Sequence, residues 1–324
     1  WKQAERELFS GGFDSWWCDS TEPFSGPDWN GEFKREPWER FRLVGDEHRK
    51  FLGAGRANLY AAAHARGIYE NQRKAAPDKR VLNLTRSGYA SSQKYGTVLW
   101  SGDIFASWDT MKKQIHEGLN MCMSGMPYWT LDIGGFFTVN ENWRHRGCFC
   151  NEDPTPKWFW RGDYETGVED YGYRELYVRW FEYGAFLPMF RSHGTDTPRE
   201  VWNFGKKGEP FYDALVKTIE MRYRLMPYIY SNAARVWAED YTMLRSLLFD
   251  FSGDHKAAGL GDEFLFGDSL LVCPVTEPMY YEKNSREIHR EKTWNCYLPK
   301  GADWYDFSSG KKYEGGAEIT VEAP

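Results

Sequence analysis

The chain has 324 residues and a formal net charge of −6, with 27% charged and 41% hydrophobic residues. Lysine and arginine are interspersed with acidic residues rather than gathered into a basic stripe, which argues against nucleic acid as a partner. No apolar run approaches the ~20 residues that span a bilayer, so we expect a soluble protein with no membrane partner. The length predicts one large domain and a smaller one.

Aromatic residues are unusually frequent, with 16 Trp, 20 Tyr and 21 Phe making up 18% of the chain. Aromatic rings fill large cores, and they also form the flat surfaces on which the apolar faces of sugars stack. The six cysteines include no CxxC pair and no metal-like grouping with histidine, so we expect neither a metal nor a cofactor. The sequence leaves the compartment open, and a secreted or periplasmic location is compatible with it.

Short apolar or β-branched runs that end in polar residues predict five strands. In chain order these strands span 12–19, 80–86, 96–103, 126–135 and 184–193. Amphipathic segments predict helices over 38–75, 107–125, 171–184 and 211–238. The last helix contains Pro227, where we expect a kink.

The alternation of strands and helices predicts an α/β fold with parallel strands. We favour a (β/α)8 barrel over an open sheet, because the strands end in polar clusters and no GxGxxG loop follows a strand. Further along, short alternating strands separated by Gly, Pro and Asp turns predict an all-β sandwich. We therefore expect the barrel part over 1–245 and the β-sandwich over 246–324. The segment 137–170 has no clear periodicity, and its role stays open.

Three aspartates stand at the ends of predicted strands, namely Asp19, Asp103 and Asp132. In a barrel the carboxyl ends of the strands carry the catalytic groups. Cleavage of a glycosidic bond with retention needs two carboxyl groups about 5–5.5 Å apart, which two neighbouring strands can supply. Each aspartate could equally be a helix N-cap or a turn residue.

Several motifs in a fixed order resemble those of one enzyme family. They are WWCDSTEP (16–23), LTRSGYASSQKYGTVLWSGDI (84–104), WTLDIGGF (129–136), FLPMFRSHG (186–194), and the stretch from FLFGDSLLVCPV to WYDFSSGKKYEGG. Together they resemble glycoside hydrolase family 31, across essentially the whole chain. The resemblance implies about strands 4–8 of the barrel and the β-sandwich that follows it.

By this resemblance Asp19 is the nucleophile and Asp103 the general acid/base of a retaining α-glycosidase. The resemblance also implies sugar contacts from further residues of the same motifs. With our own candidates from these strands, the expected substrate-binding set is Trp17, Arg86, Trp100, Trp129, Asp132, Arg191 and His193. The expected substrate is an oligosaccharide or glycoconjugate with a terminal α-glucoside or α-xyloside. An α-galactosidase, an α-N-acetylgalactosaminidase or a transglycosylase stays open, and a non-catalytic carbohydrate-binding protein is the weakest alternative.

The chemistry of the residues agrees with these roles. We expect Arg86 to lower the pKa of Asp19, and burial beside Trp100 to raise the pKa of Asp103. Arg86 could instead pair with a structural carboxylate, and His193 could be a packed core histidine. Glu22 is a rival nucleophile on spacing alone, and we rank it second.

Compared with the family, the chain begins just before the nucleophile strand. We therefore expect its partner to be the remaining N-terminal part of the same enzyme, including the first three barrel strands. Alone, the chain would leave open sheet edges, and we expect it to be inactive and poorly soluble.

Overall fold

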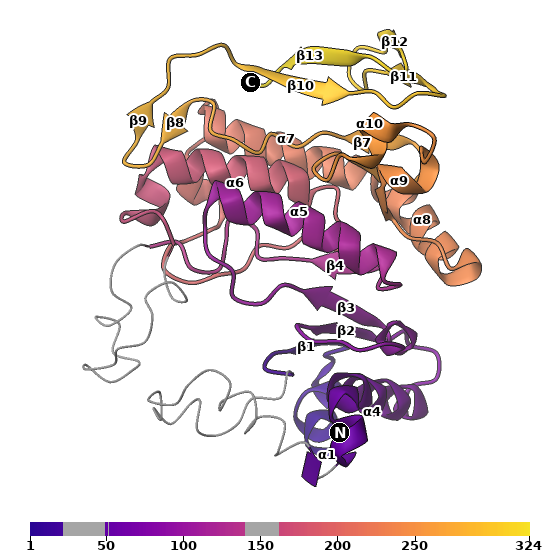
Figure 1. The fold of residues 1–324 in the computed structure, drawn as a ribbon. Coiled ribbons are helices and arrows are strands. Elements are labelled where there is room, and N and C mark those ends of the chain that lie inside the picture. The colour runs from indigo at the N-terminus through magenta and orange to yellow at the C-terminus, as the bar shows by residue number, and fades with distance from the viewer. Residues whose placement is uncertain (22–48, 51, 140–161) are drawn as a thin grey trace. The chain divides into compact units, whose positions relative to one another are not determined.

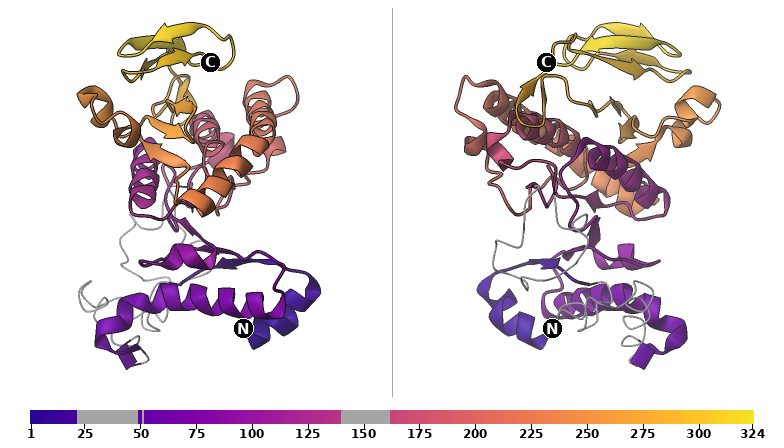
Figure 2. Two further views of the ribbon diagram at one scale, coloured as in Figure 1. Left: turned by 90° about the vertical axis from the view of Figure 1, so that its right-hand side faces the viewer. Right: turned by 60° about the vertical axis from the view of Figure 1, so that its left-hand side comes forward.

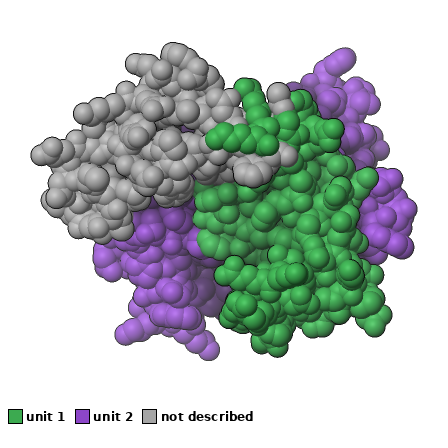
Figure 3. Space-filling view, turned by 90° about the horizontal axis from the view of Figure 1, so that it is seen from below, with its two compact units in different colours: residues 1–102, 142–160 green, residues 103–141, 161–324 purple. Residues whose placement is uncertain are grey.

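The computed structural model describes residues 1–21, 49–50, 52–139 and 162–324. The chain divides into two compact units, one formed by 1–102 with 142–160 and the other by 103–141 with 161–324 (Figure 3). Glu22 and most of the segment 137–170 lie outside the described residues.

The first unit is built on three parallel strands with the order β1-β2-β3 (Figure 1). The strands are β1 (Ser15–Cys18), β2 (Leu82–Thr85) and β3 (Thr97–Trp100). The helices are α1 (Lys2–Glu7) and α4 (Tyr60–Ala75), with 3-10 turns η1 (Phe9–Gly11), η2 (Ala54–Leu59) and η3 (Ser92–Tyr95). Parallel neighbours need a crossover connection, and α4 is the crossover between β1 and β2.

Helix α4 packs on the strands through small side chains and one buried amide. Ala61, Ala62 and Ala65 are buried on its inner face, which lets the helix approach the sheet closely. Gln72 is also fully buried, and its Oε1 accepts a hydrogen bond from Trp16 Nε1 at 2.6 Å. The indole of Trp16 therefore lies between strand β1 and helix α4.

The second unit contains four long helices. They are α5 (Trp108–Met123), α6 (Tyr171–Gly184), α7 (Pro210–Arg224) and α8 (Met226–Glu239). Shorter elements of this part are β4 (Trp129–Thr130), η6 (Gly167–Glu169) and η7 (Val201–Phe204). Helix α6 contacts α7 and donates the Tyr183 hydroxyl to a carbonyl of α5, so it lies between them (Figures 1 and 2). Aromatic side chains of α6, such as Tyr173 and Trp180, are fully buried and form the core.

Two predicted elements differ in the structure. The helix predicted over 211–238 is split at Leu225, and Pro227 lies in the first turn of α8, where its missing N–H costs no hydrogen bond. The strand predicted over 184–193 does not form in the described structure. Instead, Arg222 donates to the carbonyls of Ala185 and Leu187. Side-chain donors thus replace strand partners there.

The C-terminal region is rich in β-structure, as predicted. Its strands are β5 (Leu244–Ser246), β6 (Phe264–Phe266), β7 (Leu270–Val272), β8 (Tyr281–Glu282), β9 (Arg286–Glu287), β10 (Thr293–Tyr297), β11 (Asp303–Tyr305), β12 (Lys312–Glu314) and β13 (Glu318–Glu322). They pair antiparallel as β5-β6-β7, β8-β9, β10-β13 and β11-β12. Against prediction, residues after Ser246 form the short helices α9 (Leu247–Asp250) and α10 (His255–Ala258). Ser246 and Asp254 cap them with side-chain oxygens.

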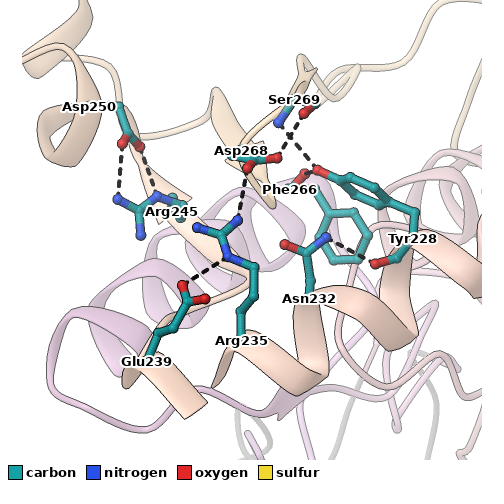
Figure 4. A network of polar contacts seen from close by, with 9 residues as sticks. All are labelled: Tyr228, Asn232, Arg235, Glu239, Arg245, Asp250, Phe266, Asp268 and Ser269. Carbon is teal, nitrogen blue, oxygen red and sulfur yellow. Dashed lines mark hydrogen bonds and ion pairs between the residues drawn. The ribbon is translucent and has the colours of Figure 1, made fainter. Parts of the chain in front are cut away.

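Helix α8 is joined to the β5-β6-β7 sheet by a polar network (Figure 4). Tyr228 donates its hydroxyl to the Phe266 carbonyl at 2.8 Å and accepts from the Ser269 N–H at 3.2 Å. Arg235 bonds Asp268 at 2.8 Å from the same helix. Backbone groups of the β6-β7 turn are thereby satisfied by a helix of the barrel part.

Helix α6 holds the β8-β9 hairpin by two buried carboxylates. Glu175 accepts hydrogen bonds from the N–H groups of Met279, Tyr280 and Tyr281 at 2.7–2.9 Å. Asp170, the N-cap of α6, accepts from Asn284 N–H at 2.8 Å and from Ser285 N–H at 3.0 Å.

In the ranges described, no helix combines the length and the apolar character needed to cross a membrane.

Candidate active site

Asp19 directly follows strand β1, and Arg86 directly follows the neighbouring strand β2. Since the two strands are parallel and in register, their carboxyl ends coincide, and Cys18 is opposite Thr85. Arg86 Nε lies 3.2 Å from Asp19 Oδ1 in an ion pair. The Arg86 side chain is 9% exposed and that of Asp19 is 41% exposed. The pair therefore presents one accessible carboxylate beside a buried cation at the end of the sheet.

A group of hydroxyl side chains supports the loop after Asp19. Thr21 hydrogen-bonds Thr85 through their hydroxyls, and Ser87 donates to Thr21 at 2.8 Å. Ser20 has a left-handed φ of 51°, and its N–H donates to Asp19 Oδ1 at 2.8 Å. The sequence analysis did not identify these residues. The signal available was the position of Thr85 and Ser87 on either side of Arg86.

Two tryptophans of the first unit stack on each other. The rings of Trp17 on β1 and Trp100 on β3 are 5.8 Å apart and inclined by 29°. Trp100 is buried, whereas Trp17 is 52% exposed and Trp16 faces the helix side. Neighbouring residues of a strand point to opposite faces, so Trp17 and Trp100 share the face away from α4.

Asp132 and Arg191 form a buried ion pair in the second unit. Arg191 Nη1 lies 2.5 Å from Asp132 Oδ1, and Asp132 is 0% exposed. Burial raises the pKa of Asp132 to about 7, although the Arg191 charge and hydrogen bond act in the opposite direction. Asp132 Oδ2 has no hydrogen-bond partner among the described residues. This oxygen is an open acceptor inside a desolvated site.

The remaining candidates of this unit lie around the same aspartate or beside it in the chain. The charge of Asp103 also raises the pKa of Asp132, so these two carboxylates interact. The ring of His193 lies 5.6 Å from that of Phe136, in the loop that follows Asp132. Trp129 is buried against α5, where a Cβ at Gly118 would lie 2.8 Å from its Cδ1. That contact places the Trp129 indole on the helix side of its strand.

Asp19 and Asp103 belong to different units, so the 5–5.5 Å separation that retention requires stays a prediction. In the described ranges, no three His, Cys, Asp or Glu side chains are grouped as metal ligands. What the two units offer chemically is a strand-terminal carboxylate beside an arginine, and a pair of interacting carboxylates beside a second arginine. Such sets suit acid–base and nucleophilic chemistry at a polar bond.

Parallel strands with carboxylates at their ends, followed by a β-rich region, are typical of (β/α)-barrel enzymes with an appended β domain. Residues 1–232 match the glycosyl hydrolases family 31 TIM-barrel domain, and residues 240–324 match the glycosyl hydrolase family 31 C-terminal domain. The chain belongs to glycosyl hydrolase family 31. The predicted family and fold class are thereby confirmed.

Related proteins of known activity are similar over nearly the whole chain. An alpha-xylosidase from Saccharolobus solfataricus is 34% identical over 311 residues, which are 96% of this chain and 36% of that protein. The human neutral alpha-glucosidase C is 30% identical over 94% of this chain and 28% of its own length. The crystal structure of a GH31 alpha-xylosidase from Xanthomonas citri superposes with a TM-score of 0.75 at 35% identity, covering 100% of this chain and 31% of that one. The chain thus spans about a third of the length of these relatives.

Asp132→Asn should change how stability depends on pH. Because the folded state raises the pKa of Asp132 from 3.8 to about 7, it binds a proton that the unfolded chain has lost between these values, and stability falls as pH rises from about 4 to 7. Asparagine carries no such proton. We expect the stability of the variant relative to the unsubstituted protein to rise over this range by a few kcal/mol, since each pKa unit corresponds to about 1.4 kcal/mol.

Thermal and urea unfolding between pH 4 and 8 measure this difference. Asp163→Asn is the matched control, because Asp163 is a partly exposed aspartate of the same unit, ion-paired with Lys283. Parallel stability curves for Asp132→Asn and the unsubstituted protein would contradict the raised pKa of Asp132 in the folded state.

Proposed function

We propose that this chain supplies the catalytic carboxylates of a retaining α-glycoside hydrolase that releases a terminal α-linked sugar. The observation that carries this proposal is the Asp19–Arg86 pair at the carboxyl ends of two adjacent parallel strands. Membership of glycosyl hydrolase family 31 supports it, because the retaining mechanism is general to that family. The sugar is proposed to be an α-xyloside or an α-glucoside, since the relatives above are named for these activities.

In the proposed reaction Asp19 attacks the anomeric carbon while Asp103 gives its proton to the glycosidic oxygen. The bond to the leaving sugar breaks, and a glycosyl ester forms on Asp19. Asp103, now ionised, takes a proton from water, which attacks the same carbon and releases Asp19 as a carboxylate. The Arg86 cation offers a charge partner to Asp19 whenever the ester is absent.

Each unit by itself offers candidate sugar contacts. Asp132 Oδ2 is the acceptor for a sugar hydroxyl, because a buried carboxylate oxygen without a partner needs a donor. Arg191 holds the other oxygen of Asp132 and fixes its direction. The exposed ring of Trp17 is proposed to pack on the apolar face of the sugar, with the buried ring of Trp100 stacked behind it. His193 keeps its predicted role as a sugar contact. The Trp129 indole is buried on the helix side of its strand, so we propose it as a packing residue rather than a sugar contact.

We also propose that the remaining N-terminal part of the same enzyme completes the barrel. Support comes from a row of exposed apolar side chains on α7 and α8, namely Tyr223, Met226, Tyr230 and Trp237, of which Trp237 is 87% exposed. Large exposed apolar side chains on two consecutive helices support an interaction site there. The boundary between barrel part and β domain is proposed at 245/246, near the end of β5.

A panel of aryl glycosides tests the class of substrate. We expect the complete enzyme to cleave aryl α-xylosides or α-glucosides and to leave aryl β-glycosides intact. Cleavage of α-galactosides or α-N-acetylgalactosaminides would change the sugar and keep the class, whereas cleavage of β-glycosides alone would contradict the proposal. Products formed with a sugar acceptor present separate transglycosylation from hydrolysis.

Asp19→Ala should abolish turnover of every substrate, since no covalent intermediate can form. Added azide should then restore cleavage by direct attack and give a β-glycosyl azide, inverted from the α-substrate. Product stereochemistry by NMR is the measurement. Asp14→Ala is the control, because Asp14 is an exposed aspartate of the same unit, paired with Lys79. An active Asp19→Ala enzyme without azide would remove Asp19 from the nucleophile role.

Asp103→Ala should slow substrates with poor leaving groups far more than activated aryl glycosides, because only the former need a proton. Azide should here give the α-glycosyl azide, since it intercepts the ester on Asp19. The kcat/KM values for a series of leaving groups measure the effect, with exposed Asp109 on α5 as the control site. Equal losses across the series would contradict the acid/base assignment.

A further inference from the structure

We infer that Arg199 is the positioning residue that holds the Asp132 loop and the His193 loop in register with each other. The inference deepens the proposed function and rests on it, since it concerns residues proposed to bind the sugar. It starts from a buried arginine that the sequence analysis did not single out.

The Arg199 guanidinium donates hydrogen bonds to two chain segments. Nη2 donates to the carbonyl of Gly135 at 2.6 Å, to that of Phe136 at 3.0 Å and to Thr138 Oγ1 at 2.9 Å. Nη1 donates to the carbonyls of Thr195 at 2.9 Å and Thr197 at 2.8 Å. Arg199 is itself buried. One planar group therefore fixes the spacing of two loops.

Each of these loops carries a proposed sugar contact. Gly135 lies three residues after Asp132 and closes a turn on it, since the Gly135 N–H donates to the Asp132 carbonyl at 2.9 Å. Thr195 lies two residues after His193, and its N–H donates to the Phe136 carbonyl at 2.9 Å. The two loops thus touch directly at the point where the guanidinium bonds both.

The surroundings of Arg199 leave it little freedom. A Cβ at position 194 would lie 2.2 Å from Arg199 Cζ, so any side chain there would displace the guanidinium from its present place. The Arg199 carbonyl accepts the hydroxyl of Tyr177 at 3.0 Å, and the same hydroxyl bonds Ser192 Oγ at 2.8 Å. Helix α6 thereby anchors Arg199 and the His193 loop together. These contacts hold the forked guanidinium in one orientation, and lysine could not reproduce its geometry.

Arg199 also brings positive charge to the site. Burial and the charge of Asp103 raise the pKa of Asp132. Arg191 lowers it through its charge and its hydrogen bond, and the charge of Arg199 lowers it to a smaller extent. Burial raises the pKa of the Tyr173 and Tyr177 phenols, and the charge of Arg199 acts in the opposite direction on both. Removing the cation should therefore move the ionisation of Asp132 to higher pH.

The test compares Arg199→Met and Arg199→Lys in the complete enzyme, with Arg222→Met as the matched control. Arg222 is a second buried arginine, and it donates only to carbonyls, those of Ala185, Leu187 and Pro188. We expect both methionine variants to lower the unfolding temperature. Only Arg199→Met should raise KM, by roughly tenfold or more, and shift the acidic limb of kcat/KM to higher pH.

Two further measurements make the result decisive. Arg199→Lys keeps the positive charge but loses the forked guanidinium. It should therefore leave the acidic limb of the kcat/KM profile unchanged and still raise KM. Arg199→Ala should recover part of its affinity on addition of guanidinium at non-denaturing concentration, and Arg222→Ala should not. If Arg199→Met does not fold, the lysine variant alone decides between raised and unchanged KM.

The inference is wrong if the Arg199 variants lose stability while KM and the pH profile stay those of the Arg222 control. The proposed function fails in a different way. It fails if the complete enzyme cleaves aryl β-glycosides alone, or if Asp19→Ala is active without azide, whatever the Arg199 variants do.

Discussion

The buried negative charge of Asp132 is the constraint on which the site in the second unit depends. A carboxylate without solvent contact is costly unless charge and hydrogen bonds compensate it, and its pKa of about 7 shows that Arg191 compensates only in part. The surrounding loops must therefore hold their geometry by other means. Arg199 supplies both a second cation and the bonds that fix these loops.

Elements with a strong local pattern were predictable from the sequence. The helix predicted over 171–184 matches α6, and the strand predicted over 80–86 contains β2, because their hydrophobic periodicity is complete within the segment. The strand predicted over 184–193 does not form, because contacts with residues distant in the sequence determine the conformation of this segment. Arg222 lies on helix α7, more than thirty residues away, and donates hydrogen bonds to three carbonyls of this segment. No local pattern in the sequence predicts these bonds.

The candidate site likewise contains residues that could be predicted from the sequence and residues that could not. Parallel pairing of β1 with β2 brings Asp19 and Arg86 together, so strand ends and topology were sufficient to expect them as neighbours. The hydroxyl of Thr21 and the guanidinium of Arg199 could not be found in this way, whereas Ser87 adjoins Arg86 in the chain. Arg199 donates mostly to backbone carbonyls, and carbonyls are present at every position and leave no mark in the residue pattern.

Several buried charged groups in this unit satisfy backbone groups that have no sheet or helix partner. Glu175 accepts three N–H groups, and Arg222 donates to three carbonyls. Asp132 differs, because only Oδ1 is engaged while Oδ2 is buried and open. Asp132 Oδ2 is one of several buried charged atoms of this unit that have no hydrogen-bond partner among the described residues, and we propose that it receives a donor from outside the chain. A sugar hydroxyl is such a donor, and it would join the substrate to the same network that Arg191 and Arg199 hold in place.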